Sequence, residues 1–565
     1  MLFPSIWGEG AVLSFSAANG ECNPDCALWG TLFASKFGAQ FLNKACFYID
    51  MTNIDLITPM CVLSDIVTAK LISNGDEYTM SMIMTKQNTM LFYSSMYVNV
   101  HFSVDGDFIV TNEAEGVYLY SAADEYLAVA CDKTTGTKYA VSYGKTREDA
   151  LKSAKDAVKE NINAQINKKI DFYQTINAPR NVIEDIEKLY YKCVSTVKAG
   201  IYGNTFSDRP PVILPYVNAY DGISVFKSLI SAVCCKNIFA EYAKSTVLTV
   251  CDMILKSGAL PFKQTCREEF IAPPVLVWAM WEVFGGDTKT LEKYYPKLRT
   301  YVKYITDNRD INKNNVFEWH SDNYNAAFST ESNMKNSPIY DDGVIQDSVD
   351  LTSFTANEAR HLAKIAKTLQ MRSEAAYWEV MFDRIKRAAN SVLYNSDDGF
   401  YYDKTIVSSH FKNIKTVAGF MPLFGGICTP QSAAAICDKL KNPAEFNTRM
   451  PIPSVSRKEQ TKCADMYRGP VWLEYNYLTA LGLKEYGFNE KADEIIKKSI
   501  LLVKNEFEKH GVIYECYSSD SAIPTQNMPR YGVTSPFYTA KNNLCCARDY
   551  IPAAAIIASY ILDLK

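Results

Sequence analysis

The spacing of apolar residues changes once along the chain, and this change constrains the fold more than any other feature. Up to about Ser142, short β-prone segments are separated by turn signals such as Asn74-Gly75-Asp76 and Asp105-Gly106-Asp107. Hairpins of a β-sandwich require this pattern. From Asn181 onward, apolar residues recur with a helical period of about 3.6, beginning with a stripe over residues 182–197. We therefore predict a β-sandwich followed by an all-α domain.

The length of the chain agrees with such a division, because 565 residues are too many for a single compact core. We predict a multidomain protein with a β-sandwich domain at residues 1–145, a helical connector at 146–180 and a helical domain at 181–565. The connector is expected to be exposed, since it is rich in Lys, Asp, Glu and Ala.

The connections between the predicted helices indicate how the helical domain closes. Close pairs are joined by short Gly or Asn turns, as at Phe284–Asp287 and Tyr486–Asn489, and longer aromatic-rich loops separate one pair from the next. A double ring of paired helices places the long loops, and with them the function, on one face. An α-solenoid would need a sequence repeat of roughly 34 to 47 residues, and none is found. We therefore predict an (α/α)6 toroid at 181–565.

Composition and motifs exclude several classes of partner. The net charge of -4 gives no basic field, which argues against nucleic acid. No apolar run approaches the roughly 20 residues of a membrane span, so no membrane partner is predicted. The sequence contains no P-loop, dinucleotide fingerprint or D-x-D-x-D-G calcium loop. We therefore predict no cofactor and no metal.

The cysteines and the N-terminal residues indicate the cellular compartment of the protein. Sixteen Cys residues are scattered without a C-x-x-C pair, and the N-terminus lacks a basic segment followed by an apolar one. Both observations favour reduced thiols and a cytoplasmic location. The oligomeric state is left open.

Five segments, in the same order along the chain, resemble landmarks of glycoside hydrolase families 63 and 37, the α-glucosidase and trehalase group. Met466–Trp472 reads M-Y-R-G-P-V-W and is similar to the group's Y-W-R-G-P-x-W signature. Glu331–Pro338 reads E-S-N-M-K-N-S-P and resembles its E-S-G-M-D-N-S-P segment. The other three are Asp350–Phe354, Gly399–Asp403 and Ile513–Tyr517. The resemblance implies an (α/α)6 toroid that hydrolyses glycosidic bonds with inversion.

Inversion needs an acid that protonates the leaving oxygen and a base that activates water, with the two carboxyls about 6.5–9.5 Å apart. In the resemblance Glu515 takes the position of the base; the alternative is a surface Glu in a loop. The group's acid Asp falls on Lys335, and a second Asp, which contacts the sugar in a W-D-S segment, falls on Lys227. Lysine has three donors and no acceptor, so neither residue can hold a sugar hydroxyl as Asp does.

Three interpretations of the two lysines stay open. In the first, the protein is an enzyme in which a uronate, phosphate or sulfate on the substrate, or acidic neighbours such as Glu331, Asp341 or Asp342, neutralise the ammonium groups. Its proton donor is then Lys335 itself or one of those carboxyls. In the second, the protein is a catalytically impaired homologue, a pseudoenzyme that binds carbohydrate. In the third, the lysines point to solvent because the motif is misaligned, and at Lys227 only Ser228 anchors the match.

Further binding residues come from the same motifs. Arg468 offers a planar set of donors for a carboxylate or two hydroxyls, with an ion pair to Asp465 as the alternative. Trp278 lies on a predicted helix that the group places near its pocket, and a core position is the alternative. We predict catalytic roles for Glu515 and Lys335, and substrate-binding roles for Arg468, Lys227, Trp472, Asn336, Glu331, Trp278 and Tyr517.

The predicted function is that of an inverting glycoside hydrolase acting on an α-linked glycoside, neutral or anionic, with a carbohydrate as its ligand. The alternatives are the carbohydrate-binding pseudoenzyme and a helical scaffold for protein interaction. The scaffold would need its pocket filled by side chains.

Overall fold

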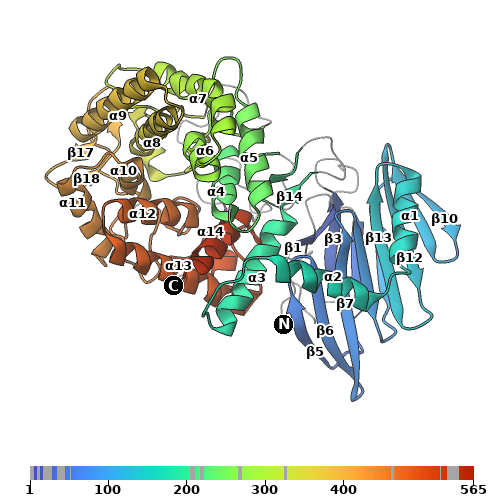
Figure 1. Ribbon diagram of the computed structural model, residues 1–565. Coiled ribbons are helices and arrows are strands. Elements are labelled where there is room, and N and C mark those ends of the chain that lie inside the picture. The colour runs from blue at the N-terminus through green and yellow to red at the C-terminus, as the bar shows by residue number, and fades with distance from the viewer. Residues whose placement is uncertain are drawn as a thin grey trace. The chain divides into compact units, whose positions relative to one another are not determined.

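The computed structural model describes residues 45–50, 52–203, 210–216, 222–264, 270–322, 328–459, 463–521, 523–530 and 546–564, together with the backbone of three short strands before them. The chain forms two compact units (Figure 1). The first contains residues 1–222, 504–513 and 548–565, and the second contains 223–503 and 514–547. The three-part division at residues 145 and 180 stays a prediction. Among the described residues, no helix is long and apolar enough to cross a membrane.

The first unit begins with two antiparallel sheets, which confirms the predicted β domain. The five-stranded sheet has the order β1-β2-β3-β4-β9, and the eight-stranded sheet has the order β10-β11-β12-β13-β8-β7-β6-β5. The strands are β1 (Ile6–Gly8), β2 (Leu13–Ser16), β3 (Leu28–Ala34), β4 (Ala45–Ile49), β5 (Leu56–Val62), β6 (Ile66–Ser73), β7 (Asp76–Lys86), β8 (Thr89–Ser94), β9 (Val100–Val104), β10 (Ile109–Ala114), β11 (Val117–Ala122), β12 (Glu125–Asp132) and β13 (Thr137–Gly144).

The two sheets pack face to face through aromatic side chains. Successive residues of a strand point to opposite faces. In β8, Phe92 packs edge-on against Phe47 of β4, with ring centroids 5.8 Å apart, whereas Leu91 belongs to an apolar cluster on the other face. The core of the sandwich therefore lies between β4 and β8, and a second apolar layer covers the eight-stranded sheet.

The two predicted turns have different outcomes. Asn74 and Gly75 have φ angles of 51° and 86°, the left-handed pair that a two-residue hairpin needs, and they join β6 to β7. Asp105-Gly106-Asp107 lies between β9 and β10, which belong to different sheets. The hairpin predicted there is wrong, because a turn signal specifies a reversal but not the strand that follows it.

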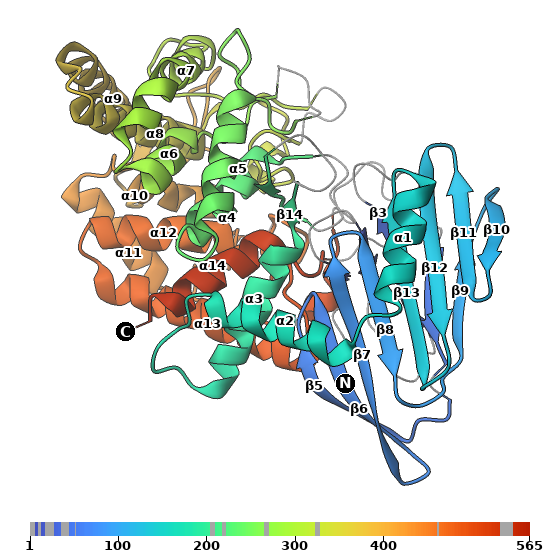
Figure 2. The same ribbon diagram turned by 45° about the vertical axis from the view of Figure 1, so that its right-hand side comes forward.

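Helix α1 (Arg147–Ala157) lies along the eight-stranded sheet over β12 and β13 (Figure 2). The hydroxyl of Thr146 caps its N-terminus by accepting the N–H of Asp149. Its apolar stripe is made of the buried residues Ala150, Leu151, Ala154 and Ala157. The prediction of an exposed helix is therefore wrong for α1, since this narrow stripe of small residues packs on the sheet.

A buried ion cluster connects the turn before β6 to two helices of the same unit. The side chain of Asp65 is fully buried, and its Oδ2 lies 2.6 Å from Lys198 Nζ and 3.2 Å from Lys169 Nζ. Its Oδ1 accepts the hydroxyl of Tyr173 at 2.5 Å. The remaining elements of this unit are α2 (Ile162–Thr175), α3 (Glu184–Ala199), β14 (Ile201–Tyr202), β15 (Val212–Ile213) and α14 (Ile551–Leu562).

The second unit is mostly helical, as predicted, and its consecutive helices pack as close pairs such as α4 with α5 and α8 with α9. Longer segments with very short strands separate the pairs. The helices are α4 (Val225–Cys235), α5 (Ala240–Asp252), α6 (Leu276–Phe284), α7 (Thr288–Asn308), α8 (Val349–Thr368), α9 (Arg372–Val392), α10 (Met421–Gly425), α11 (Pro430–Lys441), α12 (Leu473–Glu485) and α13 (Asn489–His510), and the last residues of α13 belong to the first unit. The short strands are β16 (Gln346–Asp347), β17 (Tyr394–Asn395), β18 (Phe400–Tyr401) and β19 (Lys404–Thr405).

One helix that matters for the site is absent from the sequence prediction. Helix α4 is mostly apolar, and each of its residues except Lys227 is buried. Lys227 is thus the single residue through which this helix presents a charge.

Candidate active site

Glu515 lies on a short extended segment that is fixed by backbone hydrogen bonds on both sides. The N–H of Glu515 donates to the carbonyl of Ala547 at 2.8 Å, and Tyr517 exchanges two hydrogen bonds with Val471, of 2.8 and 3.0 Å. The hydroxyl of Tyr517 accepts the N–H of Tyr514 at 3.0 Å, which closes the segment around Glu515. Tyr517, predicted to bind substrate, is itself fully buried and shapes this segment.

The carboxylate of Glu515 is fully buried among donors and cations. Arg530 binds it through two nitrogens, with Nε at 2.9 Å from Oε2 and Nη2 at 3.3 Å from Oε1. Lys227 Nζ lies 3.7 Å from Oε1, and the N–H of Ala547 donates to Oε2 at 3.4 Å. Two cations and an amide thus fix the orientation of one carboxylate.

Trp472 contacts both Lys227 and the turn of the Met466–Trp472 motif. Lys227 Nζ lies 5.7 Å above its ring centroid, and the ring stacks on Tyr467 with centroids 4.1 Å apart. The indole N–H donates to the carbonyl of Met466 at 2.9 Å. The structure therefore brings three predicted residues, Lys227, Trp472 and Glu515, into one group.

Asn336 holds the turn that carries Arg468. Its Oδ1 accepts the N–H of Tyr467 at 3.1 Å, and its Nδ2 donates to the carbonyl of Asp465 at 3.2 Å. The guanidinium of Arg468 forms a bidentate pair with Asp341, both distances being 2.7 Å, and this hydrogen bonding raises the pKa of Arg468. Its ion-pair partner is thus Asp341 and not Asp465, the alternative named from the sequence.

Lys335 lies on the segment next to that turn. Its ammonium is 3.9 Å from Asp322 Oδ2 and 5.7 Å from the ring centroid of Phe328, and 28% of its side chain is exposed. Both oxygens of Asp322 accept hydrogen bonds from Thr330, at 2.7 Å each from the backbone N–H and the hydroxyl. Since Asn336 and Tyr467 are hydrogen-bonded, the Lys335 segment is fixed to the group around Trp472.

The two remaining predicted residues lie in the core. Glu331 is fully buried, and its oxygens accept two bonds from Arg309 at 2.7 and 3.0 Å; burial raises its pKa to about 7, against the opposing effect of Arg309. Trp278 is 3% exposed, and its ring packs edge-on against Phe424 at 5.3 Å. A binding role for either residue stays a prediction.

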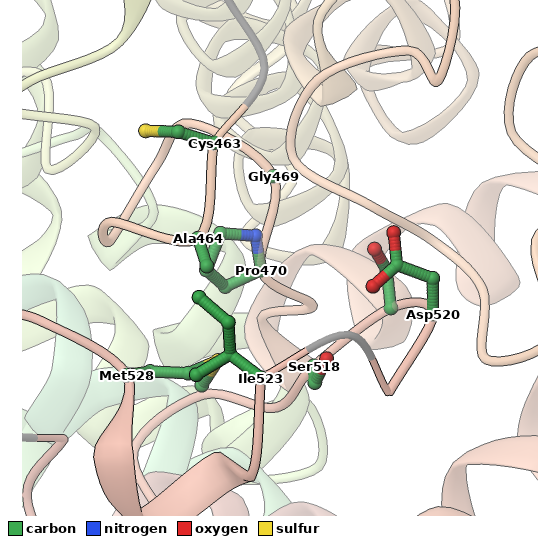
Figure 3. Close-up of a pocket in the computed structure, with 9 residues that line it drawn as sticks. Cys463, Ala464, Gly469, Pro470, Ser518, Asp520, Ile523 and Met528 are labelled. Atoms are coloured by element: carbon green, nitrogen blue, oxygen red, sulfur yellow. The ribbon is translucent and has the colours of Figure 1, made fainter.

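A cavity of about 230 Å³ borders the segments that carry Arg468 and Glu515 (Figure 3). Pro470, Ile523 and Met528 make its apolar wall, and Ser518 and Asp520 contribute polar atoms. The remaining lining residues are Cys463, Ala464, Gly469 and Ser519. Within the described ranges, no group of three or more His, Cys, Asp or Glu side chains is arranged to hold a metal ion.

Sequence reasoning missed Arg530 and Asp322, which contact the two residues predicted to be catalytic. Neither belongs to a motif, and each meets its partner through the fold: Arg530 is 15 residues from Glu515, and Asp322 is 13 residues from Lys335. Helix α4 was not predicted either, so Lys227 was identified only through its resemblance to the W-D-S segment.

Comparison with known proteins places the site within a family. Residues 240–531, just over half of the chain, match the family model of the mannosylglycerate hydrolase MGH1-like glycoside hydrolase domain. Mannosylglycerate hydrolase MGH1 of Selaginella moellendorffii is 35% identical over 130 residues, 23% of this chain and 25% of that enzyme. A relative from Borreliella burgdorferi is 27% identical over 288 residues, 49% of this chain and 57% of that protein. The alignments thus span well under two thirds of these relatives.

Solved structures agree on the fold. The GH63 mannosylglycerate hydrolase of Thermus thermophilus in complex with glucose has a TM-score of 0.54 at 18% identity, covering 66% of this chain and 99% of that one. A bacterial glucoamylase in complex with acarbose has a TM-score of 0.63 at 10% identity, covering 99% of this chain and 92% of that one. These likenesses confirm a β domain followed by an (α/α)6 helical domain.

The matched region includes every residue that the sequence predicted for the site except Lys227. The family 63 part of the resemblance is confirmed, and a specific relation to the family 37 trehalases stays a prediction. The chain therefore belongs to the mannosylglycerate hydrolase MGH1-like glycoside hydrolase family.

Proposed function

We propose that the protein is a glycoside hydrolase that cleaves an α-linked glycoside with inversion, and that Glu515 is its general base. The observation that carries this proposal is the buried Glu515 carboxylate, held by Arg530, Lys227 and the N–H of Ala547. A general base must be ionised and fixed in orientation to take a proton from water. Neighbouring cations favour the ionised form, and the two bonds from Arg530 fix the plane of the carboxylate.

The substrate is proposed to carry a negative charge. Lys227 and Lys335 bring two ammonium groups to the segments around Glu515, and charge-assisted bonds to an oxyanion are stronger than those between neutral groups. The related enzymes named above are mannosylglycerate hydrolases, and one Thermus thermophilus structure contains D-glycerate. The mixed apolar and polar walls of the neighbouring cavity suit a small hydroxylated ligand.

Hydrolysis of α-mannosyl and α-glucosyl fluoride tests the proposed activity, because fluoride departs readily as an anion and its release is measured with an electrode. We expect release by the wild-type protein. The anionic α-mannosylglycerate should inhibit this reaction at lower concentration than the neutral methyl α-mannoside. If the two inhibit equally, the substrate is not selected by charge; if neither fluoride is hydrolysed, the proposed activity is wrong.

Arg530 is expected to support Glu515 by fixing the orientation of its carboxylate. Arg530→Gln removes the bidentate pair and should lower kcat/KM for α-mannosyl fluoride on the order of 10²-fold, because a misplaced catalytic group loses its alignment with the attacking water. Arg530→Lys keeps the charge but not the two parallel hydrogen bonds, and its kcat/KM should lie between those of the wild type and Arg530→Gln. An unchanged kcat/KM in Arg530→Gln would separate Arg530 from the function of Glu515.

A further inference from the structure

Two thiols lie in contact on the two segments that position Glu515, and both segments belong to the second unit. Cys516 follows Glu515 in the chain. Cys546 precedes Ala547, whose carbonyl accepts the N–H of Glu515 and whose N–H donates to its carboxylate. The sulfur atoms of Cys516 and Cys546 are 3.6 Å apart. The N–H of Cys516 donates to the Cys546 sulfur, and the Cys546 thiol donates to the Cys516 carbonyl, both at 3.3 Å.

Burial decides how these thiols react. Cys516 is 1% exposed and Cys546 is 3% exposed. Burial raises the pKa of Cys516 well above its ordinary value, and the neighbouring Cys546 and the Glu515 carboxylate raise it further. A buried, protonated thiol reacts slowly, because the thiolate is the nucleophile. Bulky disulfide reagents are therefore excluded, and a reagent that oxidises this pair has to be small.

The cavity next to the site provides an approach for a small oxidant (Figure 3). Met528, in its wall, accepts the N–H of Cys546 through its carbonyl at 3.1 Å. Ser518 and Ser519, which follow closely after Cys516 in the chain, line the same cavity. Its volume of about 230 Å³ is several times the ~30 Å³ that a water molecule occupies in the liquid. Hydrogen peroxide, which is little larger than water, fits in this space beside both segments.

A bond between the two sulfurs would move the segments that hold Glu515. A disulfide has an S–S distance of about 2.05 Å, so the separation of 3.6 Å has to fall by about 1.5 Å. Glu515 and Ala547 are the adjoining residues in the chain, and part of this shift passes to them. A displacement of roughly 1 Å in a catalytic group lowers the rate on the order of 10²-fold.

We propose that Cys516 and Cys546 form a reversible disulfide in the presence of peroxide, and that this bond lowers the activity of the site by displacing Glu515. Hydrogen peroxide oxidises one thiol to a sulfenic acid and releases a water. The second thiol attacks that sulfur, the S–S bond forms, and the hydroxyl leaves as a second water with the proton of the attacking thiol. The two thiols thus lose two electrons, which reduce the peroxide to water. A dithiol reductant restores both thiols by exchange.

This inference rests on the proposed function, because the loss of activity is exerted through the proposed base. In the test, the reduced wild-type protein is treated with millimolar hydrogen peroxide, the excess is removed with catalase, and fluoride release from α-mannosyl fluoride is measured. We expect kcat/KM to fall on the order of 10²-fold and to return after dithiothreitol. Mass spectrometry of an unreduced digest should show peptides joined between Cys516 and Cys546, and the joined peptides should appear and disappear with the activity.

Two variants identify the thiols that respond. Cys546→Ser keeps a polar side chain of similar size but cannot form the bond, so peroxide should leave its rate at the value of the untreated variant. Cys131→Ser replaces a half-buried free cysteine on β12 in the first unit, and it should respond to peroxide as the wild type does.

Each contrary result has a separate meaning. If the wild-type rate is unchanged by peroxide, or falls without the joined peptides, the disulfide control is wrong and the proposed hydrolase stands. An equal loss of rate in Cys546→Ser means the same, since another residue is then oxidised. If Cys546→Ser does not fold, the wild-type digests decide, because joined peptides that do not follow the activity contradict the inference. Absence of fluoride release by the reduced wild type would overturn the proposed function, and the control of its activity with it.

Discussion

Changing Glu515 to glutamine is expected to lower kcat for α-mannosyl fluoride by about 10²- to 10⁴-fold. Glutamine keeps the shape of the side chain but cannot accept the proton of water. It also leaves Arg530 and Lys227 without the carboxylate that they bind. The measurement is initial fluoride release at saturating substrate, with circular dichroism and the thermal midpoint as evidence that the variant is folded.

A lost rate alone does not distinguish a base from a structural carboxylate, so a rescue experiment is needed. Glu515→Ala leaves space beside Arg530, and azide needs no base in order to attack an anomeric carbon. Added azide should restore fluoride release by this variant and give the β-mannosyl azide. A rate for Glu515→Gln within tenfold of the wild type, or no azide product from Glu515→Ala, would argue against Glu515 as the base.

Asp65→Asn is expected to lower the free energy of unfolding by about 3–5 kcal/mol at pH 7. Asparagine occupies the same space, but it leaves the buried ammonium groups of Lys169 and Lys198 without their counter-charge. The loss of one partner of a buried pair costs much more than the net contribution of the pair. Urea unfolding followed by fluorescence measures the difference, and Asp171→Asn on the exposed side of α2 is the matched control.

The same variant has an expected pH dependence. Burial alone would raise the pKa of Asp65, but Lys169 and Lys198 outweigh it and hold the pKa well below the ordinary 3.8. A carboxyl whose pKa is lowered by folding stabilises the protein above its unfolded pKa, and this contribution is lost as the pH falls. The difference between wild type and Asp65→Asn should therefore be constant near neutral pH and shrink below about pH 4. A difference below about 1 kcal/mol at pH 7 would contradict a role of this cluster in stability.

Much of the fold follows from the sequence, because the spacing of apolar residues and the residue types at turns depend only on neighbouring positions in the chain. The predicted helix Pro430–Leu440 is observed as Pro430–Lys441, and Asn74-Gly75 makes the expected hairpin. The errors arise where burial overrides local composition. Helix α1 carries a stripe of alanines among charges and packs on a sheet, and α4 buries every residue except Lys227.

The site was predictable as a set of segments but not as a set of contacts. The motifs identified Glu515, Lys335, Asn336 and Trp472, which the structure joins directly or through Tyr467. The ion-pair partners of the predicted residues could not be found in the same way. Pairing of Arg468 with Asp341 joins residues 127 positions apart, and such side-chain partners are set by the packing of the whole unit.

The anomeric configuration of the first product tests the central claim most directly. The wild-type protein is mixed with α-mannosyl fluoride, and the anomeric protons are followed by nuclear magnetic resonance before mutarotation. An inverting hydrolase with Glu515 as base must release β-mannose first. Initial release of α-mannose, or no fluoride release at all, would contradict this account of the site.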